Sequence, residues 1–177
     1  MATFTETELK DRARRRADMV NSTFVTDTEI RDYLNSSISE LHDMMVKSYE
    51  DYFVSEQTYT IPLATGGASL PADFYKALGV DYNSGGITST LKAYSFTERN
   101  VYNTPYAVID RLAQPMYKIE GTKIKLIPEN SASGTITLFY VPEATQFDGS
   151  GVTQITNVIP GYEEYIVAAT AIRMLMK

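Results

Sequence analysis

The chain has 177 residues, of which 44% are hydrophobic and 21% charged, a composition typical of one ordinary globular domain. With no cysteine and one histidine, it excludes disulfides, thiolate zinc sites, iron–sulfur clusters, cysteine nucleophiles and multi-histidine metal sites within one chain. Its formal charge of −6 argues against a general nucleic-acid binder, which would be basic. Composition therefore favours a binding or structural role over a metal-dependent or nucleophilic enzyme, and we expect no cofactor and no metal.

No targeting or membrane segment is evident in the sequence. Residues 1–9 are polar and lack the apolar core of a signal peptide. The longest apolar run, residues 165–176, is about 12 residues long, whereas a membrane span needs roughly 20. We therefore expect a soluble protein that is made in the cytoplasm and has no membrane partner.

Residues 1–54 are predicted to form a helical hairpin. The first helix has an apolar face whose members recur every three or four residues: Leu9, Ala13, Ala17 and Val20. After a polar loop, Thr26 and Glu29 have the spacing of a capping box, which begins a helix. A long apolar stripe follows, made of Ile30, Tyr33, Leu34, Ile38, Leu41, Met44, Met45, Tyr49 and Tyr52. Because the connecting loop is short, we expect the two helices to be antiparallel.

Residues 55–142 are predicted to be rich in β-structure. Alternating β-formers indicate strands at residues 57–61, 78–82, 116–120, 123–127 and 135–141. Gly121 and Thr122 form a turn between the third and fourth of these, and we expect the last three strands to make an antiparallel meander. We also expect a single helical turn at residues 70–75 and a short helix begun by a capping box of Ser95 and Glu98.

Residues 143–177 are predicted to be a polar loop followed by a helix from Gly161 onward. Glu163 and Glu164 lie in the first turn of this helix and Arg173 near its end, an order that suits the helix dipole. The helix is apolar on most sides, so we expect a subunit or partner interface to cover part of it. The candidate interface residues are Tyr165, Ile166, Ala169, Ile172 and Met176. Together the three parts, 1–54, 55–142 and 143–177, predict one α+β domain.

No group of residues in the sequence predicts a catalytic site. His42 lies in the predicted long helix beside Leu41 and Asp43; as a general base it would need an orienting carboxylate and a nucleophile, and the sequence identifies neither, so a surface or packing role is the better interpretation. Glu163 and Glu164 are adjacent on a helix and therefore point in different directions, and acids at a helix start are ordinary. Phosphate-binding and dinucleotide-binding fingerprints are absent from the sequence. We therefore expect no enzymatic activity.

A cluster of basic residues lies in the first helix, where five of the 16 basic residues fall between Lys10 and Arg16. One interpretation is a cationic patch of Arg12, Arg14, Arg15 and Arg16 that meets DNA or an acidic partner. The other is a solvated helix face balanced through local pairs by the acids nearby, namely Glu6, Glu8 and Asp11. The sequence leaves both interpretations open.

Four stretches of the sequence form a recognisable set by their order and spacing. They are Leu70-Pro71-Ala72-Asp73-Phe74-Tyr75, Tyr117-x-x-x-Gly121-x-x-Ile124-x-Leu126-x-Pro128, Thr137-Leu138-Phe139-Tyr140-Val141-Pro142, and Ile159-Pro160-Gly161-Tyr162-Glu163-Glu164-Tyr165-Ile166. Together they resemble the head–tail connector (adaptor) proteins of tailed bacteriophages. With the helical start, the likeness covers most of the chain.

This resemblance implies a structural virion protein with no reaction to assign. Connectors of this kind form rings, typically of twelve copies, that lie beneath the portal, extend the DNA channel and receive a tail or stopper protein. The implied partners are other copies of the chain, the portal, a tail or stopper protein, and the double-stranded DNA that passes without sequence-specific binding. The alternatives are a tail completion or tail-tube subunit, a small hydrolase or ligand-binding domain, and a DNA-binding module that uses the Arg-rich helix.

Overall fold

The fold is α+β, as the sequence predicts, with helices at both ends of the chain and antiparallel sheets between them. The computed structural model describes residues 4–62, 67–99, 115–129, 133–149 and 161–177. In chain order the elements are α1 (Glu6–Arg16), α2 (Asp27–Ser48), β1 (Ser55–Ile61), β2 (Ala68–Ser69), β3 (Phe74–Ser84), β4 (Ile87–Thr90), the 3-10 helix η1 (Phe96–Glu98), β5 (Met116–Glu120), β6 (Lys123–Ile127), β7 (Gly134–Pro142) and α4 (Glu163–Leu175).

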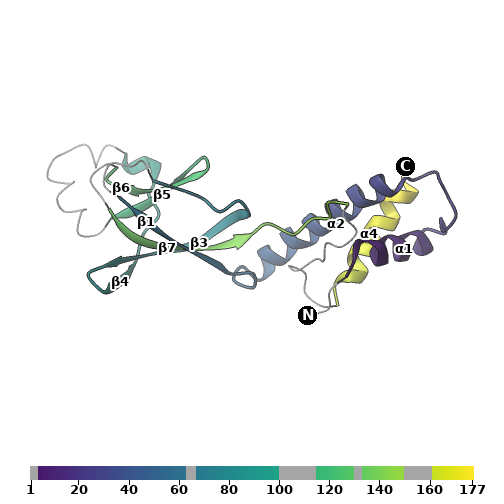
Figure 1. Cartoon of the computed structure of the whole chain (residues 1–177), viewed down its shortest axis with the longest axis horizontal. Helices are drawn as coiled ribbons and strands as arrows, with labels where there is room; N and C mark the ends of the chain where they lie inside the picture. Colours follow the sequence, from purple (N-terminus) through teal and green to yellow (C-terminus); the bar gives the residue numbers. More distant parts are fainter. Residues whose placement is uncertain (1–3, 63–66, 100–114, 130–132, 150–160) are drawn as a thin grey trace. The chain divides into compact units, whose positions relative to one another are not determined.

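The chain divides into two compact units. Unit 1 combines Met1–Tyr52 with Glu143–Lys177 and contains α1, α2 and α4, whereas unit 2 is Phe53–Pro142 and contains η1 and the described strands (Figure 1). Unit 1 is therefore built from the two ends of the chain, with the β-rich unit inserted between them in sequence.

The first two helices of unit 1 begin as the sequence dictates. The capping box of Thr26 and Glu29 forms at the start of α2, and Thr5 and Glu8 form a second one at the start of α1. Both helices end earlier than their apolar patterns suggest. Asp18 follows α1 with a positive φ of 55°, which ends the helix and leaves Val20 exposed. The last two members of the long apolar stripe, Tyr49 and Tyr52, follow the end of α2 and are exposed.

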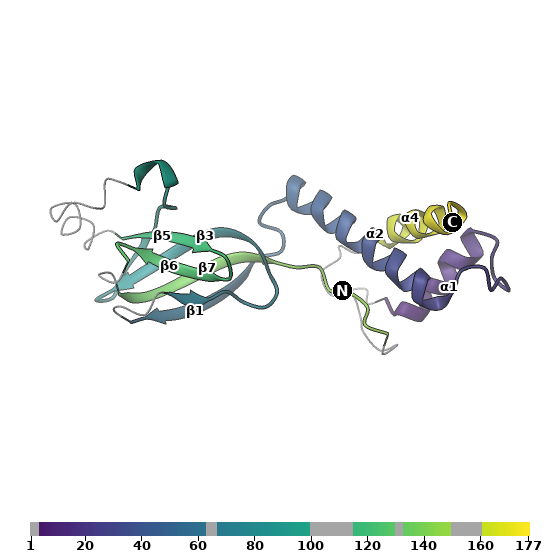
Figure 2. The ribbon, with the colours of Figure 1, turned by 90° about the horizontal axis from the view of Figure 1, so that it is seen from above.

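Helix α4 packs against both α1 and α2 (Figures 1 and 2). Its acidic first turn and basic last turn match the dipole order that the sequence predicts. The fully buried side chains that join the three helices are Leu9, Ala13, Ile30, Leu34, Ile38, Ile166 and Met174. Each large apolar side chain removed from water contributes about 1.5–3 kcal/mol, so this shared core stabilises the three helices, of which α1 and α4 are too short to be stable alone.

Unit 2 contains two antiparallel sheets. The four-stranded sheet has the order β1-β7-β3-β4, and the three-stranded sheet has the order β2-β6-β5. The hairpin of β5 and β6 forms as the sequence predicts, with Ile119 opposite Ile124. Strand β7 also forms, but it pairs with β1 and β3 and not with β6, so the expected three-stranded meander is wrong in its last pairing. Alternation of apolar residues determines which face of a strand is buried, but it does not select the neighbouring strand.

Two smaller expectations in this unit also differ from the structure. In place of the expected helical turn at residues 70–75 there is a single turn, in which the Phe74 N–H donates to the Pro71 carbonyl at 3.2 Å, and strand β3 begins at Phe74 itself. Ser95 precedes η1 but makes no side-chain capping bond, so the expected capping box is wrong. Residues 159 and 160 of the last resemblance stretch lie outside the described residues.

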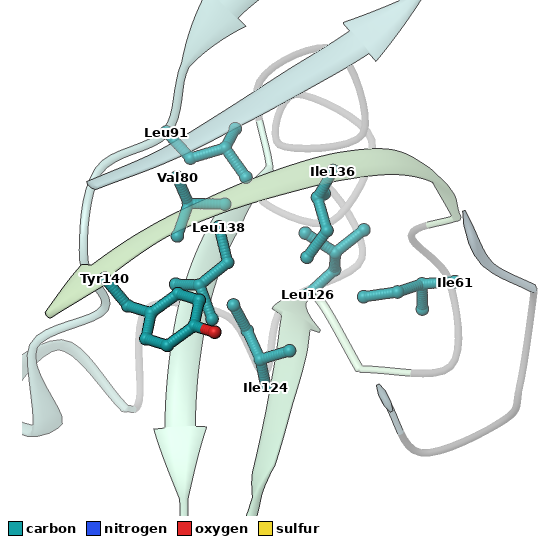
Figure 3. Packing of buried hydrophobic residues seen from close by; sticks show 8 residues of the cluster. All are labelled: Ile61, Val80, Leu91, Ile124, Leu126, Ile136, Leu138 and Tyr140. Carbon is teal, nitrogen blue, oxygen red and sulfur yellow. The ribbon is translucent and has the colours of Figure 1, made fainter. Parts of the chain in front are cut away.

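The core of unit 2 lies between the two sheets (Figure 3). The four-stranded sheet and the residue after β4 contribute Ile61, Val80, Leu91, Ile136, Leu138 and Tyr140, and the three-stranded sheet contributes Ile124 and Leu126. Strand β7 contributes the most side chains to this core, because its alternate residues Ile136, Leu138 and Tyr140 all point into it.

Candidate interaction surfaces

The outward side of α4 carries most of the candidate interface residues. Tyr165 and Ala169 are half-buried, whereas Ile172 is 57% exposed and Met176 is 80% exposed. Ile166 is only 1% exposed and belongs to the core of unit 1, so it does not reach the surface of the single chain. The other four follow one another at helical spacing along the side of α4 that faces away from the core.

The end of α4 extends this side into a larger apolar surface. Leu175 is exposed beside Ile172 and Met176, and Phe24 from the loop after α1 is exposed as well. Lys177 joins the two segments, because its Nζ donates to the Phe24 carbonyl at 2.8 Å and lies 5.1 Å from the centre of the Phe24 ring. We call Phe24, Ile172, Leu175 and Met176 the α4 apolar surface.

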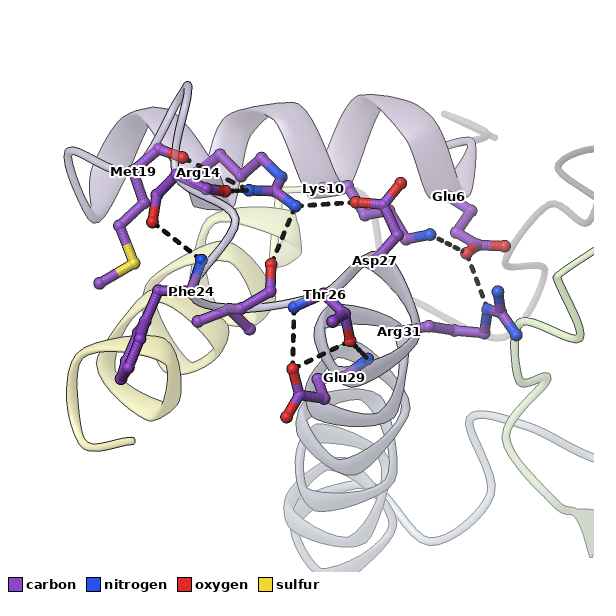
Figure 4. Close-up of polar contacts among 11 residues, drawn as sticks. Glu6, Lys10, Arg14, Met19, Phe24, Thr26, Asp27, Glu29 and Arg31 are labelled. Carbon is purple, nitrogen blue, oxygen red and sulfur yellow. Dashed lines mark hydrogen bonds and ion pairs between the residues drawn. The ribbon is translucent and has the colours of Figure 1, made fainter.

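Arg14, one of the four residues of the predicted cationic patch, is used inside unit 1 (Figure 4). Its guanidinium donates to the carbonyls of Met19, Ser22 and Val25 at 3.4, 2.9 and 3.1 Å. It also pairs with Asp27 at 2.8 Å, and this hydrogen bond holds the pKa of Asp27 below its usual value. Arg14 therefore ties the loop between α1 and α2 to the start of α2, a role for which its planar set of five donors is suited.

The other arginines of the patch are also largely neutralised. Arg12 pairs with Glu164 of α4 at 3.0 Å, and Arg16 pairs with the same carboxylate. Among the described residues, Arg15 is the member of the patch for which no ion pair is found, and its side chain is exposed. The partners of these arginines come mainly from α4 and α2, not from the neighbouring acids of the same helix that the sequence suggested.

A buried carboxylate completes the polar contacts of α1. Glu6 is 3% exposed, and its Oε1 accepts from Lys10 Nζ at 2.5 Å and from Arg31 Nε at 2.9 Å (Figure 4). Burial by itself raises the pKa of Glu6, but the hydrogen bonds from Lys10 and Arg31 outweigh it and hold that pKa below its usual value. The ionised carboxylate thus links α1 to α2.

Helices α2 and α4 are joined by a second polar cluster. Ser37 and Thr170 are fully buried with their hydroxyl oxygens 3.3 Å apart. Arg173 donates to the Ser37 hydroxyl at 2.6 Å and pairs with Glu40 at 2.8 Å. Sequence reasoning did not single out these residues, because they are 133 or more positions apart and no local pattern marks them.

Unit 2 carries a different kind of charged surface. Lys118 lies opposite Lys125 across the β5–β6 ladder, and Glu120 lies opposite Lys123. All four side chains share the face away from the core residue Ile124, because alternate residues of a strand point to opposite faces. Glu120 Oε2 pairs with Lys125 Nζ at 2.8 Å and with Lys118 Nζ at 3.2 Å. The hydrogen bond from Lys125, followed by the one from Lys118, lowers the pKa of Glu120.

The chain segment after β4 extends this face. Ala93 forms a parallel bridge with Tyr117, whose N–H donates to the Lys92 carbonyl at 3.1 Å. Lys92 and Tyr94 flank Ala93 and therefore lie on the same face as Lys118, whose Nζ is 5.9 Å from the centre of the Tyr94 ring. We call Lys92, Lys118, Lys123 and Lys125 the lysine face.

The residues considered for catalysis do not converge on a site. His42 is buried in α2. Glu163 accepts the Gly161 N–H at 2.8 Å, and Glu164 pairs with the two arginines of α1. Within the described ranges there is no group of three metal-ligating side chains, and no helix there is long and apolar enough to cross a membrane.

Comparison with known protein families gives a match. The model of a family described as SU10 adaptor protein matches residues 4–177, which is nearly the whole chain. A search of curated proteins finds no match.

Proposed function

The chain belongs to the SU10 adaptor protein family, and we propose that its copies form a closed ring at the head–tail junction of a tailed phage. The family match over residues 4–177 is the observation that carries this proposal. It supports a structural adaptor protein of the phage virion. In the proposed ring the subunit docks beneath the portal, extends the DNA channel and receives a tail or stopper protein. The resemblance to head–tail connectors sets the expected copy number at twelve.

The α4 apolar surface supports the assembly part of the proposal. A closed ring of identical subunits needs two different, complementary surfaces on each copy. Protein interfaces have an apolar centre from which charged residues are depleted, and clusters of exposed apolar side chains indicate such sites. Phe24, Ile172, Leu175 and Met176 form such a cluster on unit 1. We therefore assign the α4 apolar surface to the contact with the neighbouring subunit or with the portal.

The neutralised arginines of α1 speak against the alternative of a DNA-binding module. Phosphate binding requires cations that are not already used to join one element of the fold to another. Arg12, Arg14 and Arg16 are paired with Glu164 and Asp27, and Arg14 also holds the loop after α1. These contacts favour a structural role for the Arg-rich helix.

Native mass spectrometry of the chain alone and mixed with the portal protein of the same phage tests the proposal. We expect a large assembly with the portal, whose mass gives the number of copies. An adaptor that stays monomeric in both samples and is absent from virions contradicts the proposal. Binding to a tail protein but not to the portal indicates the alternative of a tail-side ring.

Matched variants test the assigned surface. Met176→Lys together with Ile172→Lys places charge on exposed positions, so we expect a folded monomer that no longer joins the assembly. Met44→Lys, compared with Met176→Lys alone, makes the same single change at a 41% exposed position of α2 and is expected to assemble as the wild type does. Equal assembly of both variants contradicts the assignment, and circular dichroism confirms that each is folded.

A further inference from the structure

We propose that the lysine face of unit 2 is the surface on which the subunit contacts the phosphate backbone of double-stranded DNA without reading its sequence. This inference rests on the proposed function, because it names the part of a channel subunit that meets the DNA. The lysine face lies on strands β5 and β6 and on the segment after β4, far in sequence from the Arg-rich helix that first suggested a cationic patch.

The distribution of charge separates the lysine face from the remainder of the chain. Acidic and basic residues balance in number within residues 53–142, so the whole formal charge of −6 belongs to unit 1. Counting only residues that the structure describes, the lysine face has four ammonium groups against two carboxylates, Glu120 and Glu129, the latter 3.7 Å from Lys125. The face is therefore locally positive on a chain that otherwise repels a polyanion.

The arrangement of the lysines lowers the stability of the β5–β6 hairpin, so folding by itself does not explain it. Like charges directly opposite each other in an antiparallel ladder destabilise the pair, and Lys118 faces Lys125 in this way. Glu120 offsets the repulsion by accepting from both, which also holds the two ammonium groups side by side. Each ammonium has three donors, so both lysines keep donors for a further acceptor such as a phosphate oxygen.

The surroundings of the lysines favour DNA over an acidic protein as the occupant. The centre of a protein interface is apolar and poor in lysine. None of the exposed large apolar side chains found among the described residues lies at an outward position of β5, β6 or the segment 92–94. Phosphate contact needs cations that reach solvent, as the exposed Lys92 and Lys123 do beside the half-buried Lys118 and Lys125, and it tolerates polar neighbours.

Fluorescence anisotropy with a random-sequence 20-base-pair duplex, titrated with salt, tests this assignment on the full chain. We expect Lys118→Gln/Lys123→Gln/Lys125→Gln to weaken binding at low salt by about 10-fold or more and to reduce the salt-dependence slope by about three. The matched control Arg15→Gln/Lys47→Gln/Lys76→Gln removes as many cations elsewhere and is expected to bind nearly as the wild type does. Equal losses in the two triple variants overturn the proposal.

A variant that removes a negative charge from the lysine face provides a second test. Glu120→Gln removes the carboxylate that partly neutralises Lys118 and Lys125, so we expect tighter binding, by a few-fold, with a steeper salt dependence. Unchanged or weaker binding of this variant counts against the lysine face. Displacement of the duplex by polyglutamate at equal charge concentration identifies the face as a site for acidic protein and also overturns the proposal.

The outcome is separable from that of the ring proposal. The lysine triple variant is expected to assemble with the portal as the wild type does, because the α4 apolar surface is unchanged. Loss of DNA binding with intact assembly supports both proposals. Wild-type chain that binds the duplex through the lysine face but fails to assemble contradicts the ring alone, whereas assembly without lysine-dependent DNA binding contradicts only the present inference.

Discussion

The two units of the chain use their charged residues in different ways. In unit 1, arginines pair with carboxylates from other helices, as Arg14 does with Asp27 and Arg173 does with Glu40. In unit 2, one carboxylate, Glu120, serves two lysines of the same sheet, and the sheets are joined by an apolar core. A dense run of basic residues in a sequence can therefore make contacts within the fold, whereas lysines that are far apart in sequence can lie together on one face of a sheet.

The largest expected effect is in the apolar core of unit 2. Leu138 on β7 is fully buried between the sheets, so Leu138→Ala should lower the free energy of unfolding by about 2–5 kcal/mol. Hydrogen exchange measured by mass spectrometry should show that the substitution increases the exchange rate, relative to the wild type, more in peptides from unit 2 than in peptides from α2. Leu175→Ala removes the same atoms from an exposed position of α4 and should cost no more than about 0.5 kcal/mol. Equal costs for the two substitutions contradict the core that we describe.

Arg14→Ala should have the largest effect among the polar contacts of unit 1. It removes the donor to three loop carbonyls and to Asp27, and hydrogen bonds of charged groups contribute about 1.5–3 kcal/mol. Because the site is partly exposed, we expect a loss of about 2 kcal/mol, measured by urea unfolding. Hydrogen exchange should increase in residues 17–25.

Arginine 15 provides the matched control for this prediction. Arg15→Ala changes the adjacent, exposed arginine and should leave stability within about 0.5 kcal/mol of the wild type. Arg14→Lys should not restore stability, since one ammonium cannot match the planar guanidinium across several carbonyls. A cationic patch that only meets solvent or DNA predicts similar, small effects for both arginines.

The sequence predicts the elements of both units better than it predicts their partners. The capping box at Thr26 and the hairpin of β5 and β6 depend on residues close in sequence, and both are confirmed. The pairing of β7 with β1 and the hydrogen bond between Arg173 and Ser37 join residues about 80 and 136 positions apart. Local propensity and alternation carry no information on such long-range choices, which depend on how whole elements pack.

The same distinction applies to the candidate surfaces. Helical spacing alone indicated the outward residues Tyr165, Ala169, Ile172 and Met176, but it also included Ile166, which is buried. The lysine face was not predicted, because Lys92 joins the other lysines only through the parallel bridge at Ala93. The Arg-rich run was visible in the sequence, but its partners Glu164 and Asp27 were not.

The smallest expected effect concerns the ion pair that links α4 to the start of α2. Glu29 accepts from Lys177 at 2.7 Å and from the Thr26 N–H at 2.8 Å, and these bonds, the first being the stronger influence, lower the pKa of Glu29 to about 2. A carboxyl whose pKa is lower in the folded chain stabilises it above its ordinary pKa of 4.5, and that stabilisation disappears as the pH falls toward 2. The carboxyl resonance of Glu29, followed by NMR, should therefore titrate near pH 2.

Lys177→Met separates the contribution of Lys177 from that of the capping box. Without the ammonium group, the pKa of Glu29 should rise but stay below its ordinary value, because the bonds from Thr26 remain. Stability of this variant should consequently fall less between pH 4.5 and 2 than that of the wild type. Lys47→Met, in the last turn of the same helix, should leave the titration of Glu29 unchanged. If Glu29 of the wild type titrates near 4.5, the link between α4 and α2 is too weak to count among the contacts that distinguish unit 1 from unit 2.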